Sequence, residues 1–241
     1  MQRKCNMCGK WGRFYNLDWL SKKLKEEGFP YKSTEFETLA TQYYECPHCH
    51  SSDRDRLYKL YLEKYSRNRR ALLDFAPSLV LQRYILDKKR WKTYRSADLY
   101  MDGVDDKVDI TNMHQYKDGQ FDFFICSHIL EHVDDQKALA ELYRILAPGG
   151  SGILMTPIID RDDVFDEDLN VTDEHERWRR FAQDDHVRLY SKSVFLRRVQ
   201  EAGFIVHQLD WRKLGLMNMV IYGINPKSVL YIVEKPADRS V

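Results

Sequence analysis

Two Cys-x-x-Cys pairs near the N-terminus are the residues whose type and spacing point most directly to chemistry. Cys5 and Cys8 form the first pair, and Cys46 and Cys49 form the second. Each pair places two sulfurs one zinc knuckle apart, and four sulfurs satisfy tetrahedral zinc. The stretch between the pairs is longer than in an ordinary zinc ribbon, and a helix over residues 17–27 would account for the extra length. The sequence therefore predicts a zinc-ribbon-like segment that holds one structural zinc.

Other interpretations of the cysteines remain open. The four could be free structural thiols, although both pairs lie in polar, turn-forming sequence rather than on apolar faces. A redox role is a second alternative, but neither pair lies between a strand and a helix. His48 or His50 could replace one sulfur ligand. The fifth cysteine, Cys126, ends an apolar run and is expected in the core or at the lining of a site.

Length and composition limit the classes of protein that fit. The 241 residues are enough for one main α/β domain with an appendage, and 31% charged with 43% apolar residues is the balance of an ordinary folded, soluble protein. A net charge of +1 gives no support to a nucleic-acid partner, although a local basic patch is compatible with it. No run approaches the roughly 18 apolar residues of a membrane span, so we expect no membrane contact and a cytoplasmic location.

Strand and helix signals alternate from residue 70 onwards, after a helix expected over residues 53–65. Such alternation predicts a doubly wound, mostly parallel sheet with helices on both faces. The last two strands are joined by a long excursion, which fits an antiparallel edge. We expect strands over residues 71–75, 91–98, 108–110, 121–126, 152–156, 204–209 and 228–233, and helices over 79–87, 135–146 and 191–202.

Two domains follow from this pattern, with a boundary near residue 70. A basic connector, Ser66–Arg70, separates a metal-binding segment over residues 1–69 from an α/β domain over 70–241. A charged insertion over 160–186 contains no clear strand but carries several aromatic residues. We expect this insertion to act as a lid on the substrate side.

The fourth expected strand and its surroundings carry a specific motif. The run FDFFICSHILEHV over residues 121–133 is followed by an amphipathic helix and by Leu-Ala-Pro-Gly-Gly over 146–150. This pattern resembles the fourth-strand region of class I S-adenosylmethionine-dependent methyltransferases, and the likeness extends over roughly residues 70–235. With the paired cysteines and the runs over 73–77 and 184–190, the chain further resembles a group of bacterial methyltransferases that carry an N-terminal metal segment. The resemblance implies a seven-stranded sheet, S-adenosylmethionine as cofactor and methyl transfer as the reaction.

Acidic residues at strand ends are the first candidates for the cofactor site, because ligands of a doubly wound sheet bind beyond the carboxyl ends of its strands. Asp98 ends the second strand and can accept both hydroxyls of a ribose diol. Asp109, just after the third strand, could accept from the adenine amino group. The alternative for both is a solvated loop aspartate. The full expected set is Asp74, Phe75, Ala76, Pro77, Asp98, Leu99, Asp109, Ile110, Ser127 and His128.

The first loop departs from the family pattern, which has a glycine-rich run at this point. Residues 74–78 read Asp-Phe-Ala-Pro-Ser instead. A side chain with a Cβ atom costs roughly 1–2 kcal/mol in the left-handed region, so we expect this loop to follow a different path. Pro77 suits the first helical position and Ser78 the first turn, where backbone N–H groups could meet the carboxylate of the methionine moiety.

Three histidines are candidates for a catalytic base. The resemblance places the stretch after the fourth strand opposite the transferred methyl, which favours His128 or His132. His186 follows two aspartates that would raise its pKa if they are close in space. Several arginines could receive an anionic substrate or form a solvated face: Arg54, Arg56, Arg177, Arg179, Arg180 and Arg188.

Three functions compete for this pattern. The leading one is methylation of a small molecule or of a saccharide-type hydroxyl. The second is methylation of RNA, with the zinc segment gripping the RNA, which a basic stripe across that segment would support. The third is a non-catalytic binding module that has kept the fold and lost the cofactor, and the missing glycines are its main support.

Overall fold

The computed structural model describes residues 2–65 and 69–237, so part of the expected connector, residues 66–68, lies outside the described residues. The chain folds as two compact units. The first unit runs to Lys64 and also contains Pro157–Phe195 and Leu209–Leu230. The second unit contains Tyr65–Thr156, Leu196–Gln208 and the chain from Tyr231. Two later segments therefore join the N-terminal segment in one unit.

The second unit is built on a seven-stranded sheet, as predicted. The strand order is β11-β12-β7-β6-β3-β4-β5. The pairs formed by β3 with β4, β3 with β6, β4 with β5 and β6 with β7 are parallel, whereas β12 runs antiparallel to β7. The strands are β3 (Arg69–Phe75), β4 (Trp91–Asp98), β5 (Asp106–Lys107), β6 (Phe121–Ser127), β7 (Leu146–Met155), β11 (Ile205–Leu209) and β12 (Leu230–Glu234).

One of the expected strands differs from the structure, and the expected edge is present. The third strand lies at Asp106–Lys107 rather than at 108–110. Polar contacts hold it there: Asp106 accepts from the Arg95 Nε atom at 2.6 Å, and Asp105 accepts from the Ser96 backbone at 2.8 Å. As expected, the last two strands form an antiparallel edge of the sheet: β12 lies between β11 and β7 and runs antiparallel to β7. Its apolar run is buried over four residues, whereas β11 is mostly exposed and forms the edge.

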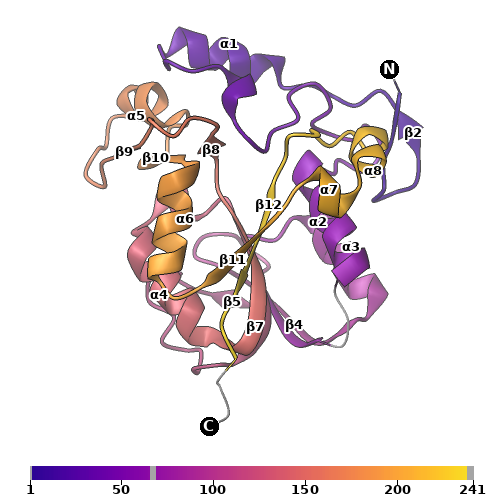
Figure 1. Cartoon of the computed structure of the whole chain (residues 1–241), viewed down its shortest axis with the longest axis vertical. Coiled ribbons are helices and arrows are strands. Elements are labelled where there is room, and N and C mark those ends of the chain that lie inside the picture. The colour runs from indigo at the N-terminus through magenta and orange to yellow at the C-terminus, as the bar shows by residue number, and fades with distance from the viewer. Residues whose placement is uncertain (1, 66–68, 238–241) are drawn as a thin grey trace. The chain divides into compact units, whose positions relative to one another are not determined.

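Helices cover both faces of this sheet. Figure 1 shows α3 (Leu79–Lys88) on the side opposite to α4 (Asp135–Ile145) and α6 (Lys192–Glu201). As predicted, α4 begins after Asp134, whose side chain accepts from the Lys137 backbone N–H, and it buries one apolar stripe. The Arg198 Nη1 atom lies 2.7 Å from the Asp135 Oδ2 atom, so a largely buried ion pair ties α6 to α4.

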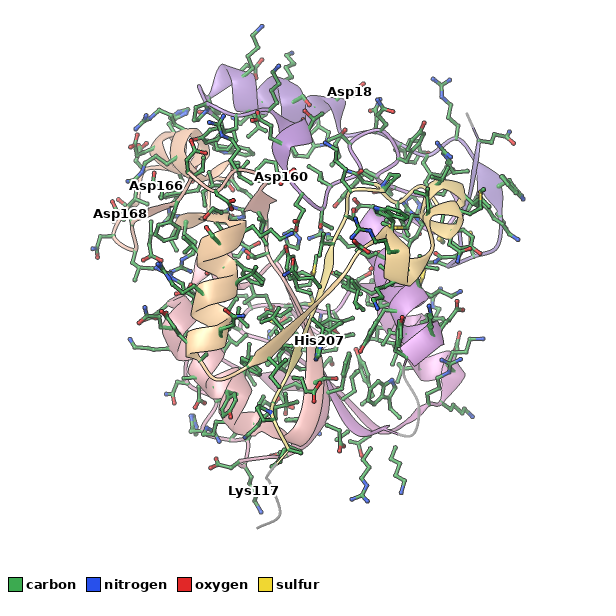
Figure 2. All side chains as sticks on the ribbon, viewed as in Figure 1. Asp18, Lys117, Asp160, Asp166, Asp168 and His207 are labelled. Atoms are coloured by element: carbon green, nitrogen blue, oxygen red, sulfur yellow. The ribbon has the colours of Figure 1, made fainter. Side chains whose placement is uncertain are left out.

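The charged insertion has more structure than expected. It contains β9 (Asp166–Glu167) and α5 (Glu174–Phe181), and β9 joins a three-stranded sheet with β8 (Ile158–Ile159) and β10 (Arg188–Ser191). The prediction of no clear strand was wrong because β9 is short and acidic. Arg180 bonds both Asp166 and Asp168, which lie beside α5 (Figure 2). This pairing lets a charged segment pack Phe181 into the core of the first unit.

Short elements complete the first unit. They are β1 (Arg3–Lys4), β2 (Trp11–Gly12), α1 (Asp18–Glu26), a 3₁₀ turn (Ser33–Glu35), α2 (Asp53–Tyr65), α7 (Trp211–Leu214) and α8 (Leu216–Ile221). Helix α1 is the predicted insertion between the cysteine pairs, and α2 has the predicted bounds. Within the described residues, no helix is long and apolar enough to cross a membrane.

Candidate functional site

The four paired cysteines meet in the first unit. Their sulfur atoms all lie within 4.8 Å of one another, with 3.6 Å between the sulfurs of Cys5 and Cys49 and 3.9 Å between those of Cys8 and Cys46. A tetrahedron with Zn–S bonds of about 2.3 Å has edges of about 3.8 Å. The sulfur positions therefore fit a tetrahedral zinc ion.

Two similar turns place these sulfurs. In the first, the Gly9 N–H donates to the Cys5 carbonyl at 2.8 Å, and Gly9 has a φ of +77°. In the second, the His50 N–H donates to the Cys46 carbonyl at 3.0 Å, and His50 has a φ of +60°. Each turn thus folds its chain around one pair and ends on a left-handed residue, as zinc knuckles require.

The histidines beside the second pair contact other groups. The His48 Nε2 atom lies 3.1 Å from the Trp11 carbonyl oxygen, and the His50 Nδ1 atom lies 2.7 Å from the Glu45 Oε1 atom. Neither ring is part of the sulfur cluster. Burial raises the pKa of the Cys46 thiol to about 12, and a bound cation would favour its thiolate form. These contacts favour four sulfur ligands over a mixed set.

The first loop of the second unit begins at the carboxyl end of β3. Asp74 is buried and accepts a hydrogen bond from the Tyr94 hydroxyl at 2.9 Å. Burial and this carboxylate hold the pKa of Tyr94 well above its usual value, so the hydroxyl remains a donor. Phe75 is buried and ends the strand. The loop is thus anchored on the sheet by its first residues.

The path of this loop corrects two expectations. Ala76 adopts a φ of +45° in spite of its Cβ atom, and its N–H donates to the Ala97 carbonyl at 2.9 Å. The loop therefore takes the left-handed turn that glycine usually supplies, at a cost of roughly 1–2 kcal/mol. Ser78 is the N-cap and α3 starts at Leu79, so Pro77 lies outside the helix rather than at its first position.

Asp98 lies at the carboxyl end of β4, next to this loop along the sheet. Its Oδ1 atom accepts from the backbone N–H groups of Tyr100 and Met101 at 2.7 and 2.6 Å. The Oδ2 atom accepts no hydrogen bond from the described residues and can receive a hydroxyl. Leu99 follows with a side chain that is 44% exposed. An oriented carboxylate beside an exposed apolar side chain suits a nucleoside.

Asp109 and Ile110 lie in the loop after β5. The Asp109 Oδ1 atom accepts from both the backbone and the hydroxyl of Thr111, at 2.8 and 2.7 Å, while its side chain stays exposed. Ile110 is buried. Asp109 therefore closes a local turn, and any contact with an adenine amino group would use its remaining oxygen.

A cluster of polar groups in the second unit follows β6, which ends at Ser127. His128 has a φ of +58°, and its N–H donates to the Met155 carbonyl at 2.8 Å. Its Nδ1 atom lies 3.2 Å from the Oε1 atom of Glu131, which is 1% exposed. The other Glu131 oxygen accepts from the Thr156 hydroxyl at 2.9 Å. A strained residue that contacts a buried carboxylate is a common feature of active sites.

Sequence reasoning placed Glu131 in the cofactor pocket, within the stretch from Ser127 to Glu131, but gave it no specific role, and it assigned no role to Thr156. The Leu-Glu-His run contained the signal for Glu131, but its burial is visible only in the structure. His132 lies farther away, with its Nε2 atom 4.0 Å from the Glu131 Oε1 atom. Cys126 is fully buried, and burial raises its pKa well above the usual value, which makes it an inert core residue.

His186 belongs to the first unit. Its side chain is 4% exposed, and its Nδ1 atom lies 3.0 Å from the Phe181 carbonyl oxygen. The Phe181 carbonyl can therefore orient the ring, in addition to the expected partners Asp184 and Asp185. The candidate arginines also have protein partners: Arg54 bonds Tyr44, Arg56 and Arg177 bond backbone carbonyls, and Arg179, Arg180 and Arg188 pair with acidic side chains.

Comparison with known proteins agrees with this architecture. Residues 52–209 match the model of a family described as a methyltransferase domain. The structure of an O-methyltransferase family protein from Burkholderia thailandensis has a TM-score of 0.52 to this chain at 14% sequence identity. The alignment covers 77% of this chain and 58% of that protein. A methyltransferase from Mesorhizobium loti described as S-adenosylmethionine dependent has a TM-score of 0.50 at 13% identity. The alignment covers 75% of this chain and 98% of that protein. An S-adenosylmethionine-dependent methyltransferase from Archaeoglobus fulgidus has a TM-score of 0.48 at 14% identity. The alignment covers 78% of this chain and 96% of that protein. Among curated proteins, none matches significantly.

Proposed function

The chain belongs to the methyltransferase domain family, and we propose that it methylates a small-molecule or saccharide-type acceptor with S-adenosylmethionine in the cytoplasm. One observation carries the proposal for the site. Two left-handed residues that are not glycine, Ala76 and His128, follow the carboxyl ends of the adjacent strands β3 and β6. Such strain persists where the backbone must leave room for a ligand or aim a side chain at it.

The residues that would hold the cofactor come from four strand ends. The free oxygen of Asp98 would accept from the ribose hydroxyls, and Leu99 would cover an apolar face of the nucleoside. The loop from Asp74 to Pro77 would turn its backbone toward the methionine moiety, and Asp109 with Ile110 would border the adenine. Ser127 and His128 would lie on the methyl side. When bound, the cofactor supplies an electrophilic methyl group on a sulfonium.

His128 is our first candidate for the base. Its Nδ1 atom lies 3.2 Å from the Oε1 atom of the buried Glu131 carboxylate, and a hydrogen bond between them would leave Nε2 as the proton acceptor. A base of this kind takes the proton of a hydroxyl or protonated amine acceptor. His132 and His186 are the alternative candidates. His186 is buried, so it could act as the base only if its Nε2 atom contacts the acceptor.

The cysteine cluster would hold zinc in a structural role. Four sulfur ligands close the coordination shell, which leaves no open position for a substrate or water. Methyl transfer from a sulfonium needs no metal. The ion would therefore stabilise the first unit.

RNA is the second candidate for the acceptor, because a basic and aromatic stripe crosses the N-terminal segment. Residues 2–16 contain four basic and no acidic side chains. Trp11, Arg13 and Tyr15 are exposed and alternate with buried residues, and Trp11 and Tyr15 are 56% and 53% exposed. Exposed aromatic rings among cations are a stacking platform for single-stranded bases. RNA oligonucleotides therefore belong in the acceptor screen.

Three measurements test these proposals. Calorimetry should detect S-adenosylmethionine binding to the purified chain, and a screen of small molecules, saccharides and RNA should release S-adenosylhomocysteine with one acceptor class. A chain that binds no cofactor would instead support the non-catalytic alternative. Metal analysis of protein purified without added metal should find about one zinc per chain. Its absence, with four freely reactive thiols in the folded protein, would contradict the zinc centre.

A further inference from the structure

Arg56 belongs to the first unit, and its guanidinium is fully buried. It is 0% exposed, and its three nitrogens donate to the backbone carbonyls of Ser51, Tyr43, Tyr44, Tyr222 and Gly223. One face of the guanidinium covers the Phe14 ring, with its Cζ atom 4.5 Å from the ring centroid. Carbonyl groups satisfy its hydrogen bonds but do not neutralise its charge.

No carboxylate forms an ion pair with Arg56 among the described residues, which is costly for a buried cation. Burial lowers the pKa of Arg56, and the nearby acidic groups that oppose this effect are Asp53, Cys5, Cys46 and Asp55. Both aspartates are already engaged. Asp53 accepts from the Ala40 and Arg54 backbones, and Asp55 accepts from Ser52.

The cysteine cluster can supply the missing charge. A zinc ion with four thiolates carries a net charge of −2. Ser51 links the two groups: its carbonyl accepts from Arg56 at 2.6 Å, and its hydroxyl lies 3.2 Å from the Cys5 sulfur and 3.4 Å from the Cys49 sulfur. We propose that Arg56 is the electrostatic counter-ion of the zinc tetrathiolate. This inference depends on the proposed zinc centre.

Arg56 connects the zinc centre to a segment outside the two cysteine loops. Arg56 joins the chain that carries the second cysteine pair to Tyr222 and Gly223, which follow α8. Zinc binding favours the ordered position of the guanidinium, and the ordered guanidinium favours zinc binding. Metal occupancy is therefore coupled to the order of the segment around residues 222–223.

Zinc affinity is the measurement that tests the counter-ion. The full-length chain is titrated against a chromophoric chelator at constant pH. Arg56→Gln, which removes the charge, should weaken zinc binding by about 10- to 100-fold. Arg54→Gln is the matched control, because Arg54 is the adjacent arginine on the same helix and bonds the Tyr44 hydroxyl instead. Arg54→Gln should change zinc affinity by less than a few fold.

A change in cluster charge separates electrostatics from loss of structure. Cys8→His keeps four ligands but reduces the net charge of the centre to −1. The effect of Arg56→Gln on zinc affinity should shrink markedly in that background, whereas a purely structural role for Arg56 gives the same fold-change in both backgrounds and overturns the inference. Should Arg56→Gln fail to fold, Arg56→Lys must retain zinc affinity within a few fold, and a larger loss counts against the counter-ion. A wild-type chain that binds no zinc would refute the zinc centre itself.

Discussion

The imidazole of His128 and the buried carboxylate of Glu131 form a pair, with 3.2 Å between Nδ1 and Oε1. The left-handed backbone of His128 turns the side chain back toward Glu131, and Thr156 holds the second oxygen of the carboxylate. Histidine orientation by a carboxylate fixes the tautomer and stabilises the imidazolium that forms when the ring takes a proton. The pair is therefore suited to general base catalysis.

Removal of the imidazole tests this role. We expect His128→Ala to lower turnover by about 10² to 10⁴-fold with little change in cofactor affinity, because a general base acts mainly in the transition state. The measurement is S-adenosylhomocysteine release with the identified acceptor, together with calorimetry for the cofactor.

Two further variants locate the base if this expectation fails. Glu131→Gln should lower turnover less than His128→Ala does and should shift the acidic limb of the pH–rate profile, because the neutral amide no longer stabilises the imidazolium. Turnover of His128→Ala within a few fold of wild type would move the base to His186 or His132. His186→Ala, measured in parallel, then decides between these two.

Asp98 gives the sharpest test of the cofactor site. Asp98→Ala removes the acceptor for the ribose hydroxyls and should weaken S-adenosylmethionine binding about tenfold or more, a cost of roughly 1–3 kcal/mol for unpaired hydroxyls. Asp98→Asn is the informative partner, because its amide can still hold the Tyr100 and Met101 N–H groups. If Asp98→Ala changes the dissociation constant by less than twofold, the ribose assignment is wrong.

Ala76 provides a stability test of the unusual first loop. Ala76→Gly relieves the left-handed strain of roughly 1–2 kcal/mol, although a more flexible unfolded chain offsets part of the gain. We expect a rise of up to about 1 kcal/mol in the free energy of unfolding measured with urea. The matched control is Ala97→Gly, a buried alanine on β4 without a positive φ, which should destabilise by roughly 1 kcal/mol. A destabilising Ala76→Gly would show that the loop strain is well below 1–2 kcal/mol.

Periodicity and motif spacing were sufficient to predict the central part of the fold. The helix after Asp134 carries a regular apolar stripe and a capping residue, and the strand over Phe121–Cys126 is a continuous buried run, so local sequence and burial agree. The order of the strands within the sheet depends on long-range packing, which determines whether β11 or β12 pairs with β7. The sequence therefore indicated an antiparallel edge formed by the last two strands, but not the order of β11 and β12 within it.

The candidate sites differ in how far the sequence could define them. The zinc ligands were identifiable because metal chemistry fixes both residue type and local spacing. The environment of a histidine depends on contacts that spacing does not encode. Glu131 becomes a partner of His128 through its burial and through Thr156, which lies 25 residues away in the chain. The left-handed turn at Ala76 was also missed, because propensity argues against it and the surrounding sheet imposes it.

Gly152 and Phe124 form a neighbouring pair across β7 and β6, and the glycine is required there by space rather than by φ. A Cβ atom at residue 152 would lie 2.5 Å from the Phe124 ring, which is fully buried. Gly152→Ala should therefore lower the free energy of unfolding by roughly 1–3 kcal/mol, the usual cost of overpacking a core. Phe124→Leu shortens the obstructing side chain, so the double variant should recover part of the loss, with a coupling of at least about 0.5 kcal/mol in a double-mutant cycle. Urea unfolding of the two single variants and the double variant measures this coupling. Strict additivity would mean that Gly152 is needed for its backbone alone.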